Sequence, residues 1–169
     1  MGYIHIYTGN GKGKTTAAFG LAIRALMSGK KVYVGQFVKD MAYNETKIAN
    51  DYENITIEQL GKGCFINKKP TAIDVSVAKK ALKKCYELYK NNAYDVIILD
   101  ELCIALYFKF FTVKEVLDYF FNQKFDAEIV ITGRYCPKEL IEKADLVTEM
   151  REIKHYYNKG IDSRDGIDK

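Results

Sequence analysis

The chain has 169 residues, of which 48% are hydrophobic and 28% charged, and its formal net charge is +4. These values are typical of one globular domain, which we expect to span residues 1–169. The chain contains no apolar run of about 18 residues, so we expect no membrane span. The amino-terminal segment begins with an apolar run at residues 3–7 and has neither the basic region nor the small-residue cleavage site of a signal peptide. This favours a cytoplasmic location.

Short apolar runs alternate with longer helical patterns along the chain. This alternation predicts βαβ units, and therefore an α/β domain with a mostly parallel central sheet flanked by helices. The polar stretch Arg151–Lys169 is expected to be ordered, either by itself or by a ligand. The expected strands are Tyr3–Tyr7, Val32–Phe37, Ile55–Leu60, Asp95–Leu99, Glu128–Thr132 and Leu146–Glu149. The expected helices are Lys14–Met27, Ala42–Tyr52, Thr71–Lys90, Thr112–Asn122 and Pro137–Lys143.

Lysines cluster in the helix expected at Thr71–Lys90, which opens with a capping-box pattern, Thr71-x-x-Asp74. The lysines fall on one face and the apolar residues on the other, as on the solvated side of an amphipathic helix. We therefore expect no nucleic-acid partner. These lysines are Lys79, Lys80, Lys83, Lys84 and Lys90.

The four cysteines lie far apart in the sequence and form no Cys-x-x-Cys pair. Neither a zinc ribbon nor a disulfide framework is expected, and free thiols are the simplest interpretation. The residues are Cys64, Cys85, Cys103 and Cys136.

The segment from Thr8 to Thr16 reads Thr-Gly-Asn-Gly-Lys-Gly-Lys-Thr-Thr and lies between an expected strand and an expected helix. This context is typical of a phosphate-binding P-loop, in which glycines allow a tight turn and backbone N–H groups point inward. The helix N-terminus adds a positive end that favours anions. Thr8 stands where the usual pattern has glycine. The expected phosphate-binding residues are Gly9, Asn10, Gly11, Lys12, Gly13, Lys14, Thr15 and Thr16.

An acidic pair, Asp100-Glu101, follows the apolar strand expected at Asp95–Leu99. Downstream of a P-loop, such a strand places a carboxylate beside the Mg²⁺ of a bound nucleotide. We expect Thr15, Asp100 and Glu101 to hold the metal, with Glu101 alternatively orienting an attacking group. Lys14 would reach the phosphates, so Lys14, Thr15 and Glu101 are the expected catalytic residues.

Three further polar residues follow expected strands: Gln36 and Lys39 after the second, and Arg134 after Ile131-Thr132-Gly133. Ligands of open α/β sheets bind at the carboxyl ends of strands, so these residues are candidates for contact with nucleotide or second substrate. The residues alone predict a site for ATP or GTP with Mg²⁺. They do not determine which bond of the nucleotide is broken. An aromatic cluster is expected in the core or at a dimer contact, or alternatively as a wall for a flat macrocycle; it comprises Tyr107, Phe108, Phe110 and Phe111.

These motifs, in their order along nearly the whole chain, resemble the ATP:corrinoid adenosyltransferases of the P-loop type. The loop from Thr8 to Thr16 looks like this family's own loop, so Thr8 becomes an expected feature. The matching segments are Tyr7–Gly20, Gln36–Lys39, Leu99–Leu102, Ile131–Arg134, Ala144–Arg151, Lys154-His155 and Gly166–Asp168.

The resemblance implies a RecA-like P-loop fold, usually in a homodimer, with ATP bound in reversed orientation along the loop. It implies transfer of the 5′-deoxyadenosyl group from ATP to Co(I) of a reduced corrinoid, with release of triphosphate and with Mg²⁺ or Mn²⁺ as the metal. An electron donor, often a flavoprotein, would supply Co(I). Phe65 is implied as an aromatic residue that helps to displace the lower cobalt ligand.

Two other functions remain open at this point. A phosphotransferase, such as a nucleoside kinase, would share Lys14, Thr15 and Asp100 but would release ADP instead of triphosphate. A nucleotide-controlled binding module would hydrolyse ATP slowly or not at all.

Overall fold

The computed structural model describes residues 1–38, 43–61 and 70–169, in which six parallel strands form one sheet in the order β3-β2-β4-β5-β1-β6. Each neighbouring pair of strands is parallel, as expected when helical segments connect them. The predicted α/β fold with a parallel sheet is therefore confirmed, and each predicted strand matches an observed one to within a residue at either end. The strands are β1 (Ile4–Thr8), β2 (Val32–Gln36), β3 (Ile55–Gln59), β4 (Val96–Asp100), β5 (Glu128–Thr132) and β6 (Leu146–Glu149).

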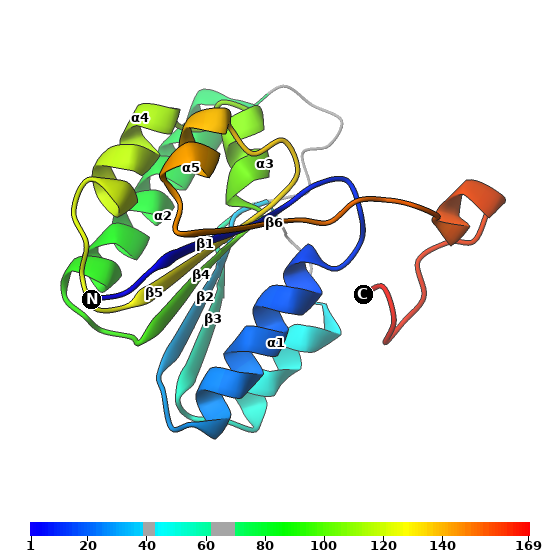
Figure 1. The fold of residues 1–169 in the computed structure, drawn as a ribbon, viewed down its shortest axis with the longest axis horizontal. Helices are drawn as coiled ribbons and strands as arrows, with labels where there is room; N and C mark the ends of the chain where they lie inside the picture. Colours follow the sequence, from blue (N-terminus) through cyan, green and yellow to red (C-terminus); the bar gives the residue numbers. More distant parts are fainter. Residues whose placement is uncertain (39–42, 62–69) are drawn as a thin grey trace.

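Helices cover both faces of this sheet, which makes three layers (Figure 1). The first helix, α1 (Lys14–Met27), lies on one face together with a short 3₁₀ helix, η1 (Asn44–Asn50). The helices that cover the other face are α2 (Ala72–Lys90), α3 (Leu102–Tyr107), α4 (Val113–Val116) and α5 (Lys138–Lys143). A π-helical turn, η2 (Leu117–Phe121), continues α4, and a 3₁₀ turn, η3 (Tyr156–Lys159), follows β6.

Strand β4 shows why a core forms on each side of the sheet. Successive strand residues point to opposite faces. Ile97 and Leu99 accordingly belong to the core under α2 and α3, while Val96 and Ile98 belong to the core under α1. A strand buried on both faces needs an uninterrupted apolar run, which is the pattern seen in the sequence.

Several helices differ from the sequence-based expectation. The helix α3 was not predicted: it begins directly after the acidic pair, and its N-cap residue, Glu101, has a left-handed backbone and makes no side-chain cap. The helix predicted at Thr112–Asn122 divides into α4 and η2, and only 44–50 of the stretch predicted at Ala42–Tyr52 is helical, as η1. The lysine-rich face of α2 is exposed, as predicted.

The aromatic cluster after the acidic pair divides between core and surface. Phe110 and Phe111 are buried, whereas Tyr107 is 58% exposed and stacks on Tyr135 with ring centroids 4.6 Å apart. Cys85, Cys103 and Cys136 are free thiols, as expected, and Cys64 lies outside the described residues. Among the described residues, no helix combines the length and apolar composition that a membrane crossing requires.

Parallel strands bring their carboxyl ends to one edge of the sheet, and the chemistry-bearing residues follow those ends. The P-loop follows β1, the acidic pair begins at the last residue of β4, and β5 lies between these two strands. Gln36 ends β2 and Thr132 ends β5 at the same edge.

Candidate active site

The glycines of the P-loop allow it to pass close to the chain that leaves β6. Gly9 has a φ of +100°, and a Cβ atom at this position would lie 2.4 Å from the carbonyl oxygen of Met150. The same oxygen accepts a 2.7 Å hydrogen bond from the N–H of Gly11. Another residue at Gly9 would be strained and would collide with backbone, so the loop geometry requires glycine here.

Thr8 stands where the usual P-loop pattern has glycine, and its side chain has a structural partner. The buried Thr8 hydroxyl donates a 2.9 Å hydrogen bond to the carbonyl oxygen of Gly133, in the turn that follows β5. This hydrogen bond, which glycine could not make, therefore links the end of β1 to the turn that carries Arg134.

Lys14 is buried inside the loop, where its Nζ atom donates a 2.7 Å hydrogen bond to the carbonyl oxygen of Gly11. Burial, and to a lesser extent the Arg134 guanidinium, lower the pKa of Lys14, while the carboxylates of Glu101 and Asp100 oppose this shift. Because burial of a cation is costly, an anion bound in the loop would stabilise the charged form of Lys14.

Asp100 is fully buried, and among the described residues Thr15, Thr132 and Gln36 donate to its carboxylate. Its Oδ1 accepts hydrogen bonds from the hydroxyls of Thr15, at 2.9 Å, and Thr132, at 2.7 Å. Its Oδ2 accepts a 3.0 Å bond from Nε2 of Gln36. The Thr132 hydroxyl in turn accepts from the N–H of Glu101 at 2.9 Å. This network fixes the acidic pair relative to the start of α1.

A cavity of about 710 Å³ opens beside the P-loop, on the side of α1. A volume of this size falls within the range of sites for small molecules and cofactors. Five of the residues predicted from the sequence share this cavity: Lys12, Thr15, Thr16, Glu101 and Arg134. The structure thus brings the P-loop, the acidic pair and the turn after β5 to one space.

Comparison with known proteins matches residues 1–168 to the family described as ATP:corrinoid adenosyltransferase BtuR/CobO/CobP. The chain belongs to this family.

Curated relatives support the same assignment over nearly the whole chain. A corrinoid adenosyltransferase of Sinorhizobium sp. is 37% identical over 171 residues, covering 99% of this chain and 80% of that protein. Those of Escherichia coli (strain K12) and Pseudomonas aeruginosa are 32% and 33% identical, again covering 99% of this chain and 85% and 83% of those proteins. The chain is therefore an adenosyl-transferring enzyme, and the kinase alternative is not favoured.

The other predicted site residues of this adenosyltransferase lie in three places. Gln36 and Asp100 are buried directly behind Thr15. Asn10 lines a separate hollow beside β6, together with Tyr135 and Val147. Lys39, like Phe65, lies outside the described residues.

Two segments of the cavity wall were not found by sequence reasoning. Residues 43–45, where η1 begins, form one side of the wall, and residues 166–169 near the carboxyl terminus form another. Neither segment carries a phosphate-binding pattern of its own, and only the three-dimensional arrangement brings them to the P-loop. The resemblance of Gly166–Asp168 to the family was the one available signal.

The oxygens at the site fit a small hard cation. The Thr15 hydroxyl and the carboxylates of Asp100 and Glu101 are donors of the kind that Mg²⁺ prefers. Within the part of the chain that the structure describes, no group of three or more His, Cys, Asp or Glu side chains forms a metal site by itself. Magnesium usually binds through one or two carboxylates, water and substrate phosphates, so the donor set suits a metal that enters with a nucleotide.

Proposed function

We propose that the cavity beside the P-loop binds ATP, with the triphosphate on residues Gly9–Thr16 and the ribose carbon C5′ accessible to a reduced corrinoid. The observation that carries the proposal is the buried Lys14, held 2.7 Å from the Gly11 carbonyl and near the carboxylates of Asp100 and Glu101. A buried cation at the first residue of a helix, where the helix N-terminus adds its positive end, is suited to a polyanion.

In the proposed reaction the Co(I) centre of the corrinoid donates its electron pair to C5′ of ATP. A cobalt–carbon bond forms, the bond between C5′ and the triphosphate oxygen breaks, and its electron pair leaves on triphosphate. The corrinoid supplies the nucleophile, so the protein needs no side-chain nucleophile or general base. Its main chemical task is to stabilise the negative charge that develops on the leaving oxygen.

Lys14 and the loop amides are proposed to perform this task, and Arg134 adds a second cation at the cavity wall. Thr15, Asp100 and Glu101 would hold Mg²⁺, which when bound neutralises part of the triphosphate charge. The Gln36 and Thr132 side chains keep the Asp100 carboxylate in place through the hydrogen bonds described above. Lys39 remains a proposed contact for nucleotide or corrinoid.

The setting of the reaction is also proposed. The use of ATP favours the cytoplasm, and the need for Co(I) favours an electron donor such as a flavoprotein. A homodimer is proposed from the resemblance, supported by exposed apolar side chains near β6, including Ile141, Leu146 and Val147. A solution mass of twice 19.4 kDa would support the dimer, and a mass of 19.4 kDa at working concentration would reject it.

The decisive experiment incubates the protein with ATP, Mg²⁺ and chemically reduced cobalamin, and follows the absorbance of the adenosyl product. We expect stoichiometric adenosylcobalamin and triphosphate. Release of ADP or orthophosphate without the adenosyl product would place the broken bond between phosphorus atoms and reject the proposal.

Substitution of Lys14 tests the assigned phosphate site. Lys14→Ala should lower the transfer rate by about 10²-fold or more, the scale of losing one donor that stabilises a developing anion. The matched control is Lys90→Ala, which removes an exposed lysine at the carboxyl end of α2, away from the site. Near-normal transfer by Lys14→Ala would contradict the assignment.

A further inference from the structure

Lys12 was expected to bind phosphate, but its side chain contacts the carboxyl-terminal part of the chain. Its Nζ atom pairs with the Asp168 carboxylate and donates to the carbonyl oxygen of Ile167 at 2.8 Å and to the Tyr156 hydroxyl at 2.9 Å. The Asp168 side chain is only 10% exposed. The Lys12 ammonium is therefore engaged by oxygens of the carboxyl-terminal part of the chain.

We define residues 156–169 as the C-terminal strap, and further contacts shape it around Asp168. The Tyr156 hydroxyl also donates to the Asp168 carboxylate. Arg164 donates to Oδ2 of Asp168 from its backbone N–H at 3.0 Å and from Nε at 3.1 Å, and its guanidinium lies 4.4 Å from the centroid of the Tyr156 ring. The strap is thus closed into a loop whose polar centre is one carboxylate.

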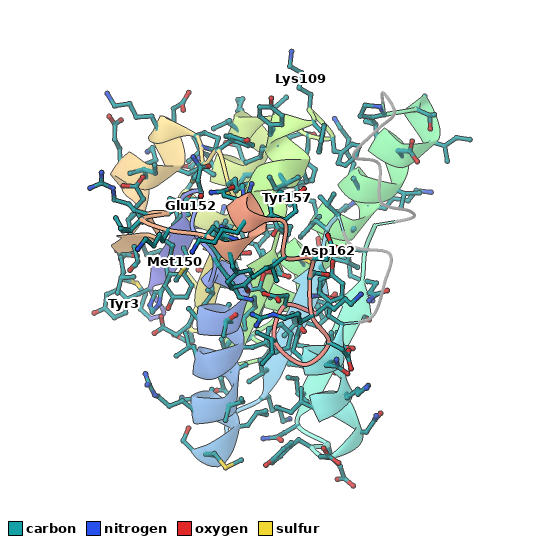
Figure 2. All side chains as sticks on the ribbon, turned by 90° about the vertical axis from the view of Figure 1, so that its right-hand side faces the viewer. Tyr3, Lys109, Met150, Glu152, Tyr157 and Asp162 are labelled. Atoms are coloured by element: carbon teal, nitrogen blue, oxygen red, sulfur yellow. The ribbon has the colours of Figure 1, made fainter. Side chains whose placement is uncertain are left out.

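A second attachment fixes the other side of the strap. Nδ2 of Asn44, at the start of η1, donates to Oδ1 of Asp165 at 2.7 Å and to the carbonyl oxygen of Lys169 at 2.9 Å. Residues 167–169 take part in these two attachments, and residues 166–169 line the nucleotide cavity. Figure 2 shows the chain leaving Met150 and Glu152 and passing in front of the molecule through Tyr157 and Asp162.

The electrostatics of Asp168 support a permanent charge there. Hydrogen bonds from Lys12 and then from Tyr156 hold the pKa of Asp168 well below its ordinary value, with Arg164 adding to the effect. The carboxylate is ionised at neutral pH, so the attraction between Lys12 and Asp168 is fully present under working conditions.

We propose that the Lys12–Asp168 pair is a latch that holds the C-terminal strap as the outer wall of the nucleotide cavity. Lys12 is then a positioning residue for the strap and not a ligand of the triphosphate. This inference rests on the proposed nucleotide site. A wall latched in this way restricts the bound ATP and keeps water from the reacting carbon.

The C-terminal strap opens at a low free-energy cost. Most of its side chains are exposed, and segments with few buried apolar contacts open locally at low free-energy cost. The Lys12 side chain is 38% exposed, so water screens the ion pair and the latch yields when nucleotide enters or leaves. ATP that contacts the closed strap would shift this equilibrium towards closure.

The first test is amide hydrogen exchange of the ATP-free protein. Asp168→Asn should speed exchange across residues 156–168 while exchange in β1 and β4 stays unchanged. The control is Asp162→Asn, which neutralises an exposed carboxylate elsewhere in the strap that makes no contact with Lys12. Equal exchange in wild type and Asp168→Asn would overturn the latch. Because this measurement needs neither ATP nor corrinoid, it tests the latch independently of the proposed function.

The second test is kinetic and uses a double-mutant cycle. Lys12→Ala, Asp168→Ala and the double variant should each raise the KM for ATP by about two- to fivefold, with the double variant no worse than either single one. A loss in Lys12→Ala that is far larger than in Asp168→Ala, and that adds to it, would mean that Lys12 binds phosphate directly and would overturn the proposal.

Discussion

At the scale of single residues, Thr8 departs from the usual P-loop pattern, and its hydrogen bond gives a physical reason for the departure. Its hydroxyl donates to the Gly133 carbonyl in a buried position. Thr8→Val keeps the shape of the side chain but leaves that carbonyl without its donor, which costs about 1–3 kcal/mol of folding free energy. Chemical denaturation should show this loss, with Thr8→Ser as the control that retains the hydroxyl.

The contrasting outcome is also informative. If Thr8→Val unfolds at the same denaturant concentration as wild type and Thr8→Ser does not, the methyl group and not the hydroxyl is the stabilising part of Thr8. Thr8→Gly would restore the usual pattern, yet we expect it to be less stable than wild type, because it loses the hydrogen bond and gains backbone freedom in the unfolded state.

The cysteines give a pH-dependent prediction. A hydrogen bond from the Cys103 thiol lowers the pKa of Cys136, whereas the same contact and burial raise the pKa of Cys103, and burial raises that of Cys85 to about 12. Because the thiolate is the reactive form, Cys136 should react with iodoacetamide before Cys85 and Cys103. Its rate should reach half of its maximum below the ordinary thiol pKa of about 8.5.

Peptide mass spectrometry over a range of pH measures the order of modification. Cys136→Ser should remove the fast modification at position 136, and Cys103→Ala, which removes the hydrogen-bond donor, should move the Cys136 rate profile to higher pH. Modification of Cys85 at the rate of Cys136 would contradict the assignment.

The sequence predicts those site residues that belong to a local motif. The sequence placed Lys14 and Thr15 in a P-loop and Asp100 at the end of a strand, because glycine spacing and an apolar run are local patterns. The hydrogen bond from Gln36 to Asp100 depends on the register of β2 against β4, and the pairing of Lys12 with Asp168 joins residues 156 positions apart. No local pattern encodes such contacts.

At the scale of elements, α1, α2 and the strands were predictable and α3 was not. The strands are continuous apolar runs and α2 has an amphipathic period with a capping box, so the local signal is strong. The helix α3 has six residues and begins without a side-chain cap. Its position is set by packing of Leu102 and Leu106 into the core, which is a tertiary effect.

The capping box of α2 provides a test at this scale. The Thr71 hydroxyl accepts a hydrogen bond from the N–H of Asp74, while the Asp74 carboxylate accepts from the N–H and hydroxyl of Thr71. Thr71→Ala should lower the free energy of unfolding by about 1 kcal/mol. For a chain of this size the melting temperature should fall by about 2–4 °C, whereas Thr71→Ser should melt near wild type.

The contribution of the Asp74 carboxylate depends on pH. Hydrogen bonds from Thr71 lower the pKa of Asp74 below its ordinary value of 3.8. A lowered pKa in the folded state means that the stabilisation is present above pH 3.8 and is lost as the pH falls through the folded-state value. The difference between wild type and Thr71→Ala should therefore be constant near neutrality and shrink in acid.

At the scale of the whole molecule, the parallel sheet explains why one edge carries the chemistry. Four strands, β1, β2, β4 and β5, deliver the P-loop, Gln36, Asp100 and the turn that bears Arg134 to the same edge. The cavity is completed by η1 and by the C-terminal strap, which come from distant parts of the chain. A ligand in this cavity contacts the P-loop, η1 and the C-terminal strap together, so its binding should stabilise the folded state as a unit.

Thermal unfolding with Mg²⁺ and ATP measures this coupling. At an ATP concentration about 100 times Kd, binding to the folded state adds about 2.7 kcal/mol, which corresponds to a rise of about 5–10 °C in melting temperature. Lys14→Ala should melt near wild type without nucleotide and lose most of the rise, because the buried cation that we propose binds the triphosphate is gone. Lys90→Ala should keep the whole rise, since that lysine ends α2 and does not line the cavity. A wild-type melting temperature that does not respond to saturating ATP would contradict binding of ATP to the folded protein, and a full rise in Lys14→Ala would show that the triphosphate does not lie on Lys14.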